Sequence, residues 1–392
     1  MTKSIRIPVN HTVIDWAINY GEKSYEELIK KYKIKSWKNP KKKNDSPTLK
    51  QLQNFSNDTK IPFYYFLNDE IPKEDHSFVK FRTVNNSNVI PSRKLIDTIN
   101  NMKSRQAWMK DYINEEKVNN QFKLNSFITF DISIDTAAKK VANLLDYKKT
   151  YEKRNTDEDT FKIIRQKISS LGIIVMKNGV VEFNNHRKLD VNEFRAFALV
   201  DKVAPLIFIN KNDSQKAQIF SLVHEFIHIL IGQSEILNVS PDLSNLELTK
   251  KKERWINSVT INTLLPKEDV LKYINKDNPK ESIMSISKHF HTSLMATSIY
   301  LKELGIYKNI DYIINWAREK QDTAVSIKIN KKQKNGGPPP YKVAISRVDA
   351  RFANAVINSE KSGQTPIGSA ASMLGLSVKT YDSFVQEFFK LE

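Results

Sequence analysis

The feature that most restricts how this sequence can fold is a long apolar segment between Gln215 and Ile231. Asp213-Ser214 precedes it and is typical of a helix N-cap, while Gly232 follows it and is typical of a helix C-terminus. These signals predict one long helix. The sequence His224-Glu225-Phe226-Ile227-His228 lies within it.

Two histidines four residues apart lie on the same face of a helix, so His224 and His228 can present imidazole nitrogens to one metal ion. Glu225 lies just off that face. Its carboxylate could take a proton from a water molecule at the metal and later deliver it to a leaving amine. The alternative is a chance pair of histidines on an amphipathic helix. We favour the metal site because two imidazoles among apolar neighbours are costly to bury without a partner.

A third protein ligand would leave one tetrahedral position open, as catalytic zinc requires. The chain has no cysteine, so this ligand must be His, Asp or Glu. Downstream carboxylates include Glu235, Asp242, Glu247 and Glu253. Glu253 is favoured because it lies early in a helix whose apolar face could pack beside the first helix. The alternative for Glu253 is an exposed charge near a helix N-terminus, where the helix dipole favours it.

The residues before the first helix predict a small sheet. A helical pattern over residues 161–171 ends at Gly172, and residues 173–176, 194–200 and 206–209 have the composition of strands. The series ends in the helix that carries the histidines. The predicted fold class is therefore α+β and mostly helical.

The rest of the chain is expected to be largely helical. Ser24 followed by Glu27 is a capping-box pattern within a set of short helices. The predicted helical regions are 11–66, 92–147, 267–305, with two short helices around residues 290–292, and 347–389. Residues 148–159 are expected to form a charged loop, and residues 321–342, which are basic and rich in Gly and Pro, a linker or exposed loop.

The stretch from Leu189 to His228 resembles the ImmA/IrrE family of metallo-endopeptidases, as do Glu253-Arg254-Trp255-Ile256-Asn257 and Leu264-Leu265-Pro266. The resemblance implies a zincin-like (gluzincin) protease core with a small sheet. It also implies a Zn²⁺ ion held by His224, His228 and Glu253, with Glu225 as the general base.

The resemblance extends to the flanking segments. Residues 12–66, which include Pro47-Thr48-Leu49-Lys50-Gln51-Leu52, resemble a degenerate helix-turn-helix. Residues 283–305 are similar to a second helix-turn-helix-like unit, and residues 336–384 resemble the C-terminal module of longer family members. The expected segments are 1–70 (helix-turn-helix), 71–158 (helical connection), 159–267 (peptidase core), 268–322 (helix-turn-helix-like unit), 323–342 (linker) and 343–392 (C-terminal helical module).

The formal net charge of +18 suits nucleic acid or an acidic protein partner, although a composition rich in Lys, Asn and Ile can arise without such a partner. Several lysines cluster around the turn of the N-terminal unit, where they could contact DNA phosphates. They are Lys35, Lys38, Lys41, Lys42 and Lys43. Pro40 and the lysine run disfavour a regular recognition helix. We therefore favour no sequence-specific reading, and binding to another protein or formation of a homodimer is the alternative.

No long uncharged apolar run and no secretory signal are visible, so we expect a cytoplasmic protein outside the membrane. Family members typically cleave a repressor, and longer members commonly occur in toxin–antitoxin operons. The resemblance therefore implies a regulatory endopeptidase that cuts a repressor or partner protein in a prophage, stress-response or toxin–antitoxin context. The alternatives are an antitoxin that neutralises a toxin by contact, with a structural or residual zinc site, and a DNA-binding regulator.

Three further histidines lie outside the predicted metal site. His289 and His291 are interpreted as ordinary surface or core residues, because residues two apart face differently on a helix. His186 follows a predicted strand and could approach a substrate cleft.

Overall fold

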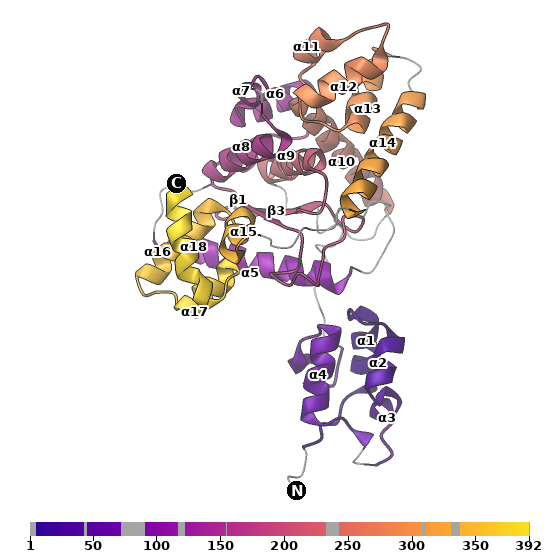
Figure 1. Cartoon of the computed structure of the whole chain (residues 1–392), viewed down its shortest axis with the longest axis vertical. Coiled ribbons are helices and arrows are strands. Elements are labelled where there is room, and N and C mark those ends of the chain that lie inside the picture. Colours follow the sequence, from indigo (N-terminus) through magenta and orange to yellow (C-terminus); the bar gives the residue numbers. More distant parts are fainter. Residues whose placement is uncertain are drawn as a thin grey trace. The chain divides into compact units, whose positions relative to one another are not determined.

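The computed structural model describes residues 5–42, 45–71, 91–116, 122–153, 155–232, 243–307, 311–330 and 338–391. The chain forms two compact units, Met1–Asn100 and Asn101–Glu392. Among the described residues the fold is α+β and mostly helical, with one three-stranded sheet, as the sequence predicts (Figure 1). The finer division into six segments stays a prediction.

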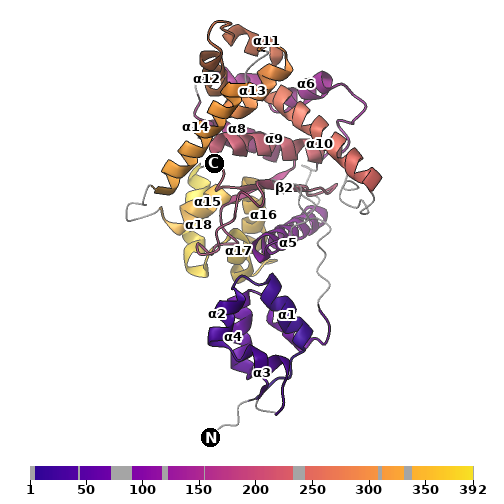
Figure 2. The same ribbon diagram turned by 90° about the vertical axis from the view of Figure 1, so that its right-hand side faces the viewer.

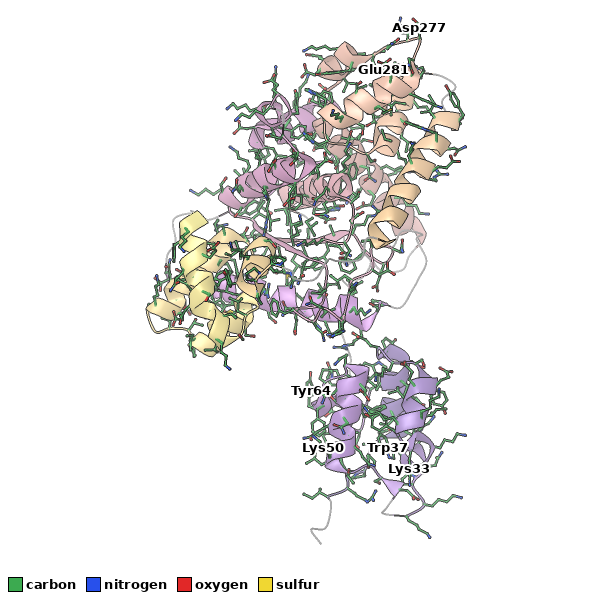
Figure 3. The ribbon with its side chains drawn as sticks, viewed as in Figure 1. Lys33, Trp37, Lys50, Tyr64, Asp277 and Glu281 are labelled. Atoms are coloured by element: carbon green, nitrogen blue, oxygen red, sulfur yellow. The ribbon has the colours of Figure 1, made fainter. Side chains whose placement is uncertain are left out.

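Short helices in the first unit enclose an aromatic core. Ser24 and Thr48 each begin a helix with a complete capping box, which confirms the helix start predicted at Ser24. Trp37, labelled in Figure 3, is 2% exposed and packs edge-on against Phe55, with ring centroids 5.6 Å apart. The elements are α1 (His11–Tyr20), α2 (Tyr25–Lys31), α3 (Ile34–Lys38), α4 (Leu49–Thr59) and the 3₁₀ helix η2 (Phe63–Leu67).

The sheet of the second unit has the strand order β1-β3-β2. Strand β3 (Leu206–Asn210) pairs in parallel with β1 (Ile174–Asn178) and antiparallel with β2 (Ala196–Leu199). Nearly every strand residue is buried because both faces are covered. Helices α8 (Asp157–Ser170) and α9 (Gln215–Ile231) cover one face. The part of α5 (Arg93–Glu115) that belongs to the second unit lies on the other face (Figure 1, Figure 2), where the Gln106 amide donates to the carbonyl of Leu199.

The other helices of the second unit pack around this central layer. On the side of α9 they are α6 (Ile134–Leu144), α7 (Tyr147–Tyr151), α10 (Leu243–Leu264), α11 (Lys267–Val270), η5 (Leu271–Tyr273), α12 (Pro279–His289), α13 (Leu294–Glu303) and α14 (Asp311–Asn330). The C-terminal module contains α15 (Pro340–Arg347), α16 (Ala350–Lys361), α17 (Ile367–Leu374) and α18 (Val378–Leu391). No helix in the described part of the chain is long and apolar enough to cross a membrane.

The helix predicted from Gln215 to Ile231 is confirmed at both ends. The Ser214 hydroxyl accepts a hydrogen bond from the backbone N–H of Ala217, which caps the first turn. Gly232 ends the helix in the left-handed region with φ of 69°. The two caps fix the length of α9 and therefore the positions of its histidines along the sheet.

The predicted helix over 92–147 is wrong between residues 122 and 133, where the chain forms turns. This segment packs along the C-terminal end of α9. The Phe127 N–H donates to the carbonyl of Leu230 at 2.9 Å, and Asn125 lies against Gly232. Long-range packing therefore overrides a helical pattern here, because the backbone groups find partners on another element.

Three other boundaries differ from the predictions. Tyr147–Tyr151 is helical although residues 148–159 were expected to form a loop, because Tyr147 and Tyr151 bury their rings. Helix α10 begins at Leu243, earlier than the start expected near Lys250. Helix α14 reaches Asn330 and α15 begins at Pro340, so helix extends into both ends of the expected linker 321–342. Gly336 and Gly337 lie outside the described residues.

Candidate metal centre

The structure brings His224, His228 and Glu253 together. The two Nε2 atoms of the histidines lie 3.2 Å apart. Glu253 directs Oε2 to within 3.6 Å of His224 Nε2 and Oε1 to within 3.3 Å of His228 Nε2. Among the described residues this is the only group of three His, Asp or Glu side chains whose potential ligand atoms all lie within 4.8 Å of one another.

Helix α9 positions both histidines. It is buried on nearly all sides because α8, α10, β2 and β3 pack around it. The His224 side chain is 1% exposed and stacks on Phe220, whereas the His228 side chain is 21% exposed. Since the four-residue spacing places both rings on one face, the pair opens toward solvent on the side of His228.

Helix α10 supplies the carboxylate. Ile256 and Val259 are fully buried, and the Thr263 hydroxyl contacts the carbonyl of Ala138 in α6 at 3.5 Å. Glu253 lies one turn before Ile256, so the packing of this apolar face turns the carboxylate toward α9. Because α10 starts at Leu243, Glu253 lies well inside the helix, and the alternative of a charge favoured at a helix N-terminus no longer applies.

The charge of Glu253 is held by its neighbours. Burial of the carboxyl group opposes ionisation, but the imidazoles of His224 and His228 outweigh it and keep the pKa of Glu253 well below its ordinary value. The site therefore offers one carboxylate and two imidazoles, a donor set that first-row divalent metals prefer.

These distances fit a tetrahedral ion. Ligand bonds of about 2.0–2.1 Å at tetrahedral angles place neighbouring ligand atoms about 3.3 Å apart. The two histidine Nε2 atoms lie 3.2 Å apart, and the two oxygens of Glu253 lie 3.3 Å from His228 Nε2 and 3.6 Å from His224 Nε2, which is close to this value. Three protein ligands leave the fourth position free for water or substrate.

Glu225 occupies the position next to His224 and is 5% exposed. Its place beside the ligand pair in the sequence is the one that the proposed general base would occupy. The structure thus brings the three predicted ligand residues together, and their roles, like that of Glu225, stay predictions.

The described structure places none of the other candidate third ligands near the two histidines. Glu235 and Asp242 lie outside the described residues, and the side chain of Glu247 is not described either. His186 is exposed in the connection between β1 and β2 and does not belong to the metal-ligand group.

His289 and His291 have structural contacts. His291 is 4% exposed, and its Nδ1 lies 2.8 Å from the Asp157 carboxylate at the start of α8. His289 packs against the rings of Tyr151 and Tyr273. These contacts agree with their interpretation as ordinary histidines.

The lysines predicted to contact nucleic acid differ in their exposure and in their partners. Lys38 forms an ion pair with Asp15 at 2.6 Å. Lys35, Lys41 and Lys42 are exposed, and the backbone N–H groups of Lys41 and Lys42 donate to Asp45. Lys43 lies outside the described residues. The three exposed side chains have the accessibility that phosphate contact would need.

Comparison with known families adds a finding for the second unit. Residues 168–302 match the Peptidase M78 family model, described as the IrrE N-terminal-like domain. This span contains the sheet, α9, α10 and the His–His–Glu group. No curated protein and no solved structure is significantly similar to the chain.

Proposed function

We propose that this chain, a member of the ImmA/IrrE family of metallopeptidases, is a zinc-dependent regulatory endopeptidase. In this proposal His224, His228 and Glu253 hold the ion in a zincin-like core of the gluzincin type. The observation that carries the proposal is the convergence of two imidazole nitrogens and one carboxylate group at separations close to those around a tetrahedral ion.

The reaction class follows from the groups at the site. When bound, zinc polarises the scissile carbonyl and lowers the pKa of water toward about 7. The Glu225 carboxylate accepts the proton of the attacking water and passes it to the nitrogen of the leaving amine. The burial of His224 limits the entry of bulk water beside the reacting bond.

The test compares wild-type protein with Glu225→Gln and with His186→Ala. His186 is exposed and outside the ligand group, so its variant is the matched control. We expect about one zinc ion per chain in all three proteins. New protein N-termini should appear in cells that express wild-type or His186→Ala protein and be absent with Glu225→Gln. Equal cleavage by Glu225→Gln would refute the role of Glu225, and purified protein without zinc would refute the metal.

We further propose that the substrate is a protein with a regulatory role, such as a transcriptional repressor or the partner encoded beside this chain. The metal group belongs to one part of a chain that also has an N-terminal helical unit and a C-terminal helical module. Such helices give surface for recognising a folded partner, which suits selective cleavage better than general protein breakdown.

A second candidate function is neutralisation of a partner, such as a toxin, by direct binding, with zinc kept for structure. The helical segments outside the family match favour it. In this case Glu225→Gln would bind and neutralise the partner as well as wild-type protein does. This non-catalytic alternative also includes DNA binding through Lys35, Lys41 and Lys42. It would be seen as a complex with promoter DNA whose affinity falls steeply as the salt concentration rises.

A further inference from the structure

Three cationic residues lie near the carboxyl ends of β1 and β3, where Lys211 is close enough for its charge to act on Lys177 and for the charge of Arg347 to act on it. Lys177 lies near the end of β1, opposite Ile209 in the parallel ladder, and Lys211 follows Ile209 by two residues. Because strand side chains alternate between faces, Lys177 and Lys211 lie on the same face of the sheet. That face is covered by α8, since Lys177 Nζ lies 4.0 Å from the ring centroid of Phe161.

The third cation is Arg347, the last residue of α15. Its position is fixed by Arg165 of α8, which donates hydrogen bonds to the carbonyls of Ser346, Arg347 and Val348 at 2.9, 3.3 and 2.7 Å. Arg165 also donates to the carbonyl of Val175 in β1. The end of α15 is thus held beside β1, as Figure 1 shows.

The nearby acidic groups form their direct contacts elsewhere, and Glu158 acts on Lys177 and Lys211 only from a distance. Glu158 pairs with Lys162 at 3.4 Å. Asp349 is 1% exposed, binds two backbone N–H groups and lies close enough to offset the charge of Arg165. Among the described residues no carboxylate forms an ion pair with Lys177, Lys211 or Arg347. We refer to these three residues as the cation cluster.

The three residues of the cation cluster differ in exposure, because Lys177 is buried, Arg347 is half-buried and Lys211 is exposed. Lys177 is 8% exposed, and the Nε atom of Arg347 is buried with no hydrogen-bond partner among the described residues. Burial, followed by the charges of Arg165 and Lys211, lowers the pKa of Lys177 to about 8. Burial and then the charge of Arg347 lower the pKa of Lys211. A charge at the low exposure of Lys177 is costly without an ion-pair partner, so a bound anion would relieve this cost.

We propose that Lys177, Lys211 and Arg347 bind a phosphate group of a small ligand, such as a phosphate ester or a pyrophosphate. A carboxylate ligand carries one negative charge, which is too little to balance three cations. A phosphate group carries about two negative charges at neutral pH and balances more of this charge. Ligands commonly bind beyond the carboxyl ends of parallel strands. The low exposure of Lys177 favours a small ligand, because a nucleic-acid backbone needs cations that reach outward.

This site is separate from the metal centre. Lys211 precedes the first turn of α9, and His224 lies about 14 Å further along that helix from Gln215. The proposal therefore does not depend on peptidase activity and can be tested by binding alone.

The test is calorimetric titration of the full chain with inorganic phosphate and pyrophosphate at about 20 mM salt, where screening is weak. We expect saturable binding by wild-type protein. Lys211→Ala and Arg347→Ala should each weaken it about tenfold or more, since each removes a charge-assisted hydrogen bond. Lys276→Ala removes an exposed lysine elsewhere and should leave the affinity unchanged.

Lys177→Met gives a second readout. Lys177 Nζ faces the Phe161 ring but has no ion-pair partner among the residues that the structure describes. Removing this nearly buried ammonium should raise the melting temperature of the ligand-free protein, while the increase caused by pyrophosphate should disappear. His228→Ala should bind pyrophosphate like wild-type protein, which separates the cluster from any metal at the other site. Equal affinity in wild-type, Lys211→Ala and Arg347→Ala proteins would overturn the proposal. So would binding of duplex DNA that pyrophosphate does not displace.

Discussion

Asp349 accepts a hydrogen bond from the backbone N–H of Val175 at 3.0 Å, across 174 residues of sequence. Val175 belongs to β1, which pairs with a strand on one side only. The carbonyl of Val175 accepts from Arg165, so both backbone groups on the outer edge at this residue have partners. The C-terminal module thus protects an edge strand that would otherwise offer its backbone to other chains.

We expect Asp349→Ala to destabilise the second unit by about 2–4 kcal/mol, because it removes the cap of α16 and leaves a buried N–H unsatisfied. Faster amide hydrogen exchange in β1 and α16 would measure the loss. Asp382→Ala removes an exposed carboxylate from α18 and serves as the control. Unchanged exchange in Asp349→Ala would mean that this contact does not hold the module.

Gly375 is the second point where the module meets the core. It ends α17 with φ of 80°, and a Cβ atom there would overlap the ring of Phe183 from the β1–β2 connection. Gly363 has φ of 77° with open space around it. Both alanine variants strain the backbone, but only Gly375→Ala also displaces Phe183. We expect Gly375→Ala to cost about 1–3 kcal/mol more than Gly363→Ala in denaturant unfolding. Equal losses of stability in the two variants would show that the Phe183 ring can move away without a free-energy cost.

Removal of one proposed ligand should weaken metal binding without unfolding the chain. Glu253→Gln keeps the shape of the side chain but not its charge. Loss of a residue that only hydrogen-bonds to a metal ligand lowers metal affinity about 10–100-fold. Glu253 is a proposed ligand itself, so we expect the zinc affinity of Glu253→Gln to fall by more than this. Glu268→Gln changes an exposed carboxylate on α11 and should retain full affinity. Competition with a chelator measures both, and equal affinities would exclude Glu253 as a ligand.

The first unit should lose stability in acid through Asp58. Burial raises the pKa of this carboxyl group, but hydrogen bonds from Lys31, Tyr32 and Lys23 outweigh it and lower the pKa to about 2. Since the pKa is lower in the folded state, the stabilisation is complete above about pH 4 and is lost as the pH falls toward 2.

We expect Asp58→Asn to cost about 1 kcal/mol at pH 7, because salt screens the exposed lysines, and less at pH 3. Urea unfolding of both proteins at the two pH values measures the difference. A stability difference between the two proteins that is larger at pH 3 than at pH 7 would contradict the stabilising role of ionised Asp58. Asp69→Asn, at an exposed position of the same unit, controls for the loss of one charge.

The sequence by itself determined the elements whose signals are local. Ser214 and Gly232 fix the ends of α9, and the spacing of His224 and His228 places both rings on one face whatever the surroundings. The small sheet followed from short β-branched runs, and the helix start at Ser24 followed from its capping box. These predictions succeed because caps and periodicity act within a few residues.

Only the tertiary structure decided what depends on distant segments. Residues 122–133 leave the helical pattern because α9 offers them backbone partners. The approach of Glu253 to the histidines depends on how the apolar face of α10 packs. The meeting of Lys177, Lys211 and Arg347 carries no local signal, since α15 must first lie beside β1. Such contacts arise from packing between elements far apart in the chain, and a pattern of neighbouring residues does not encode that packing.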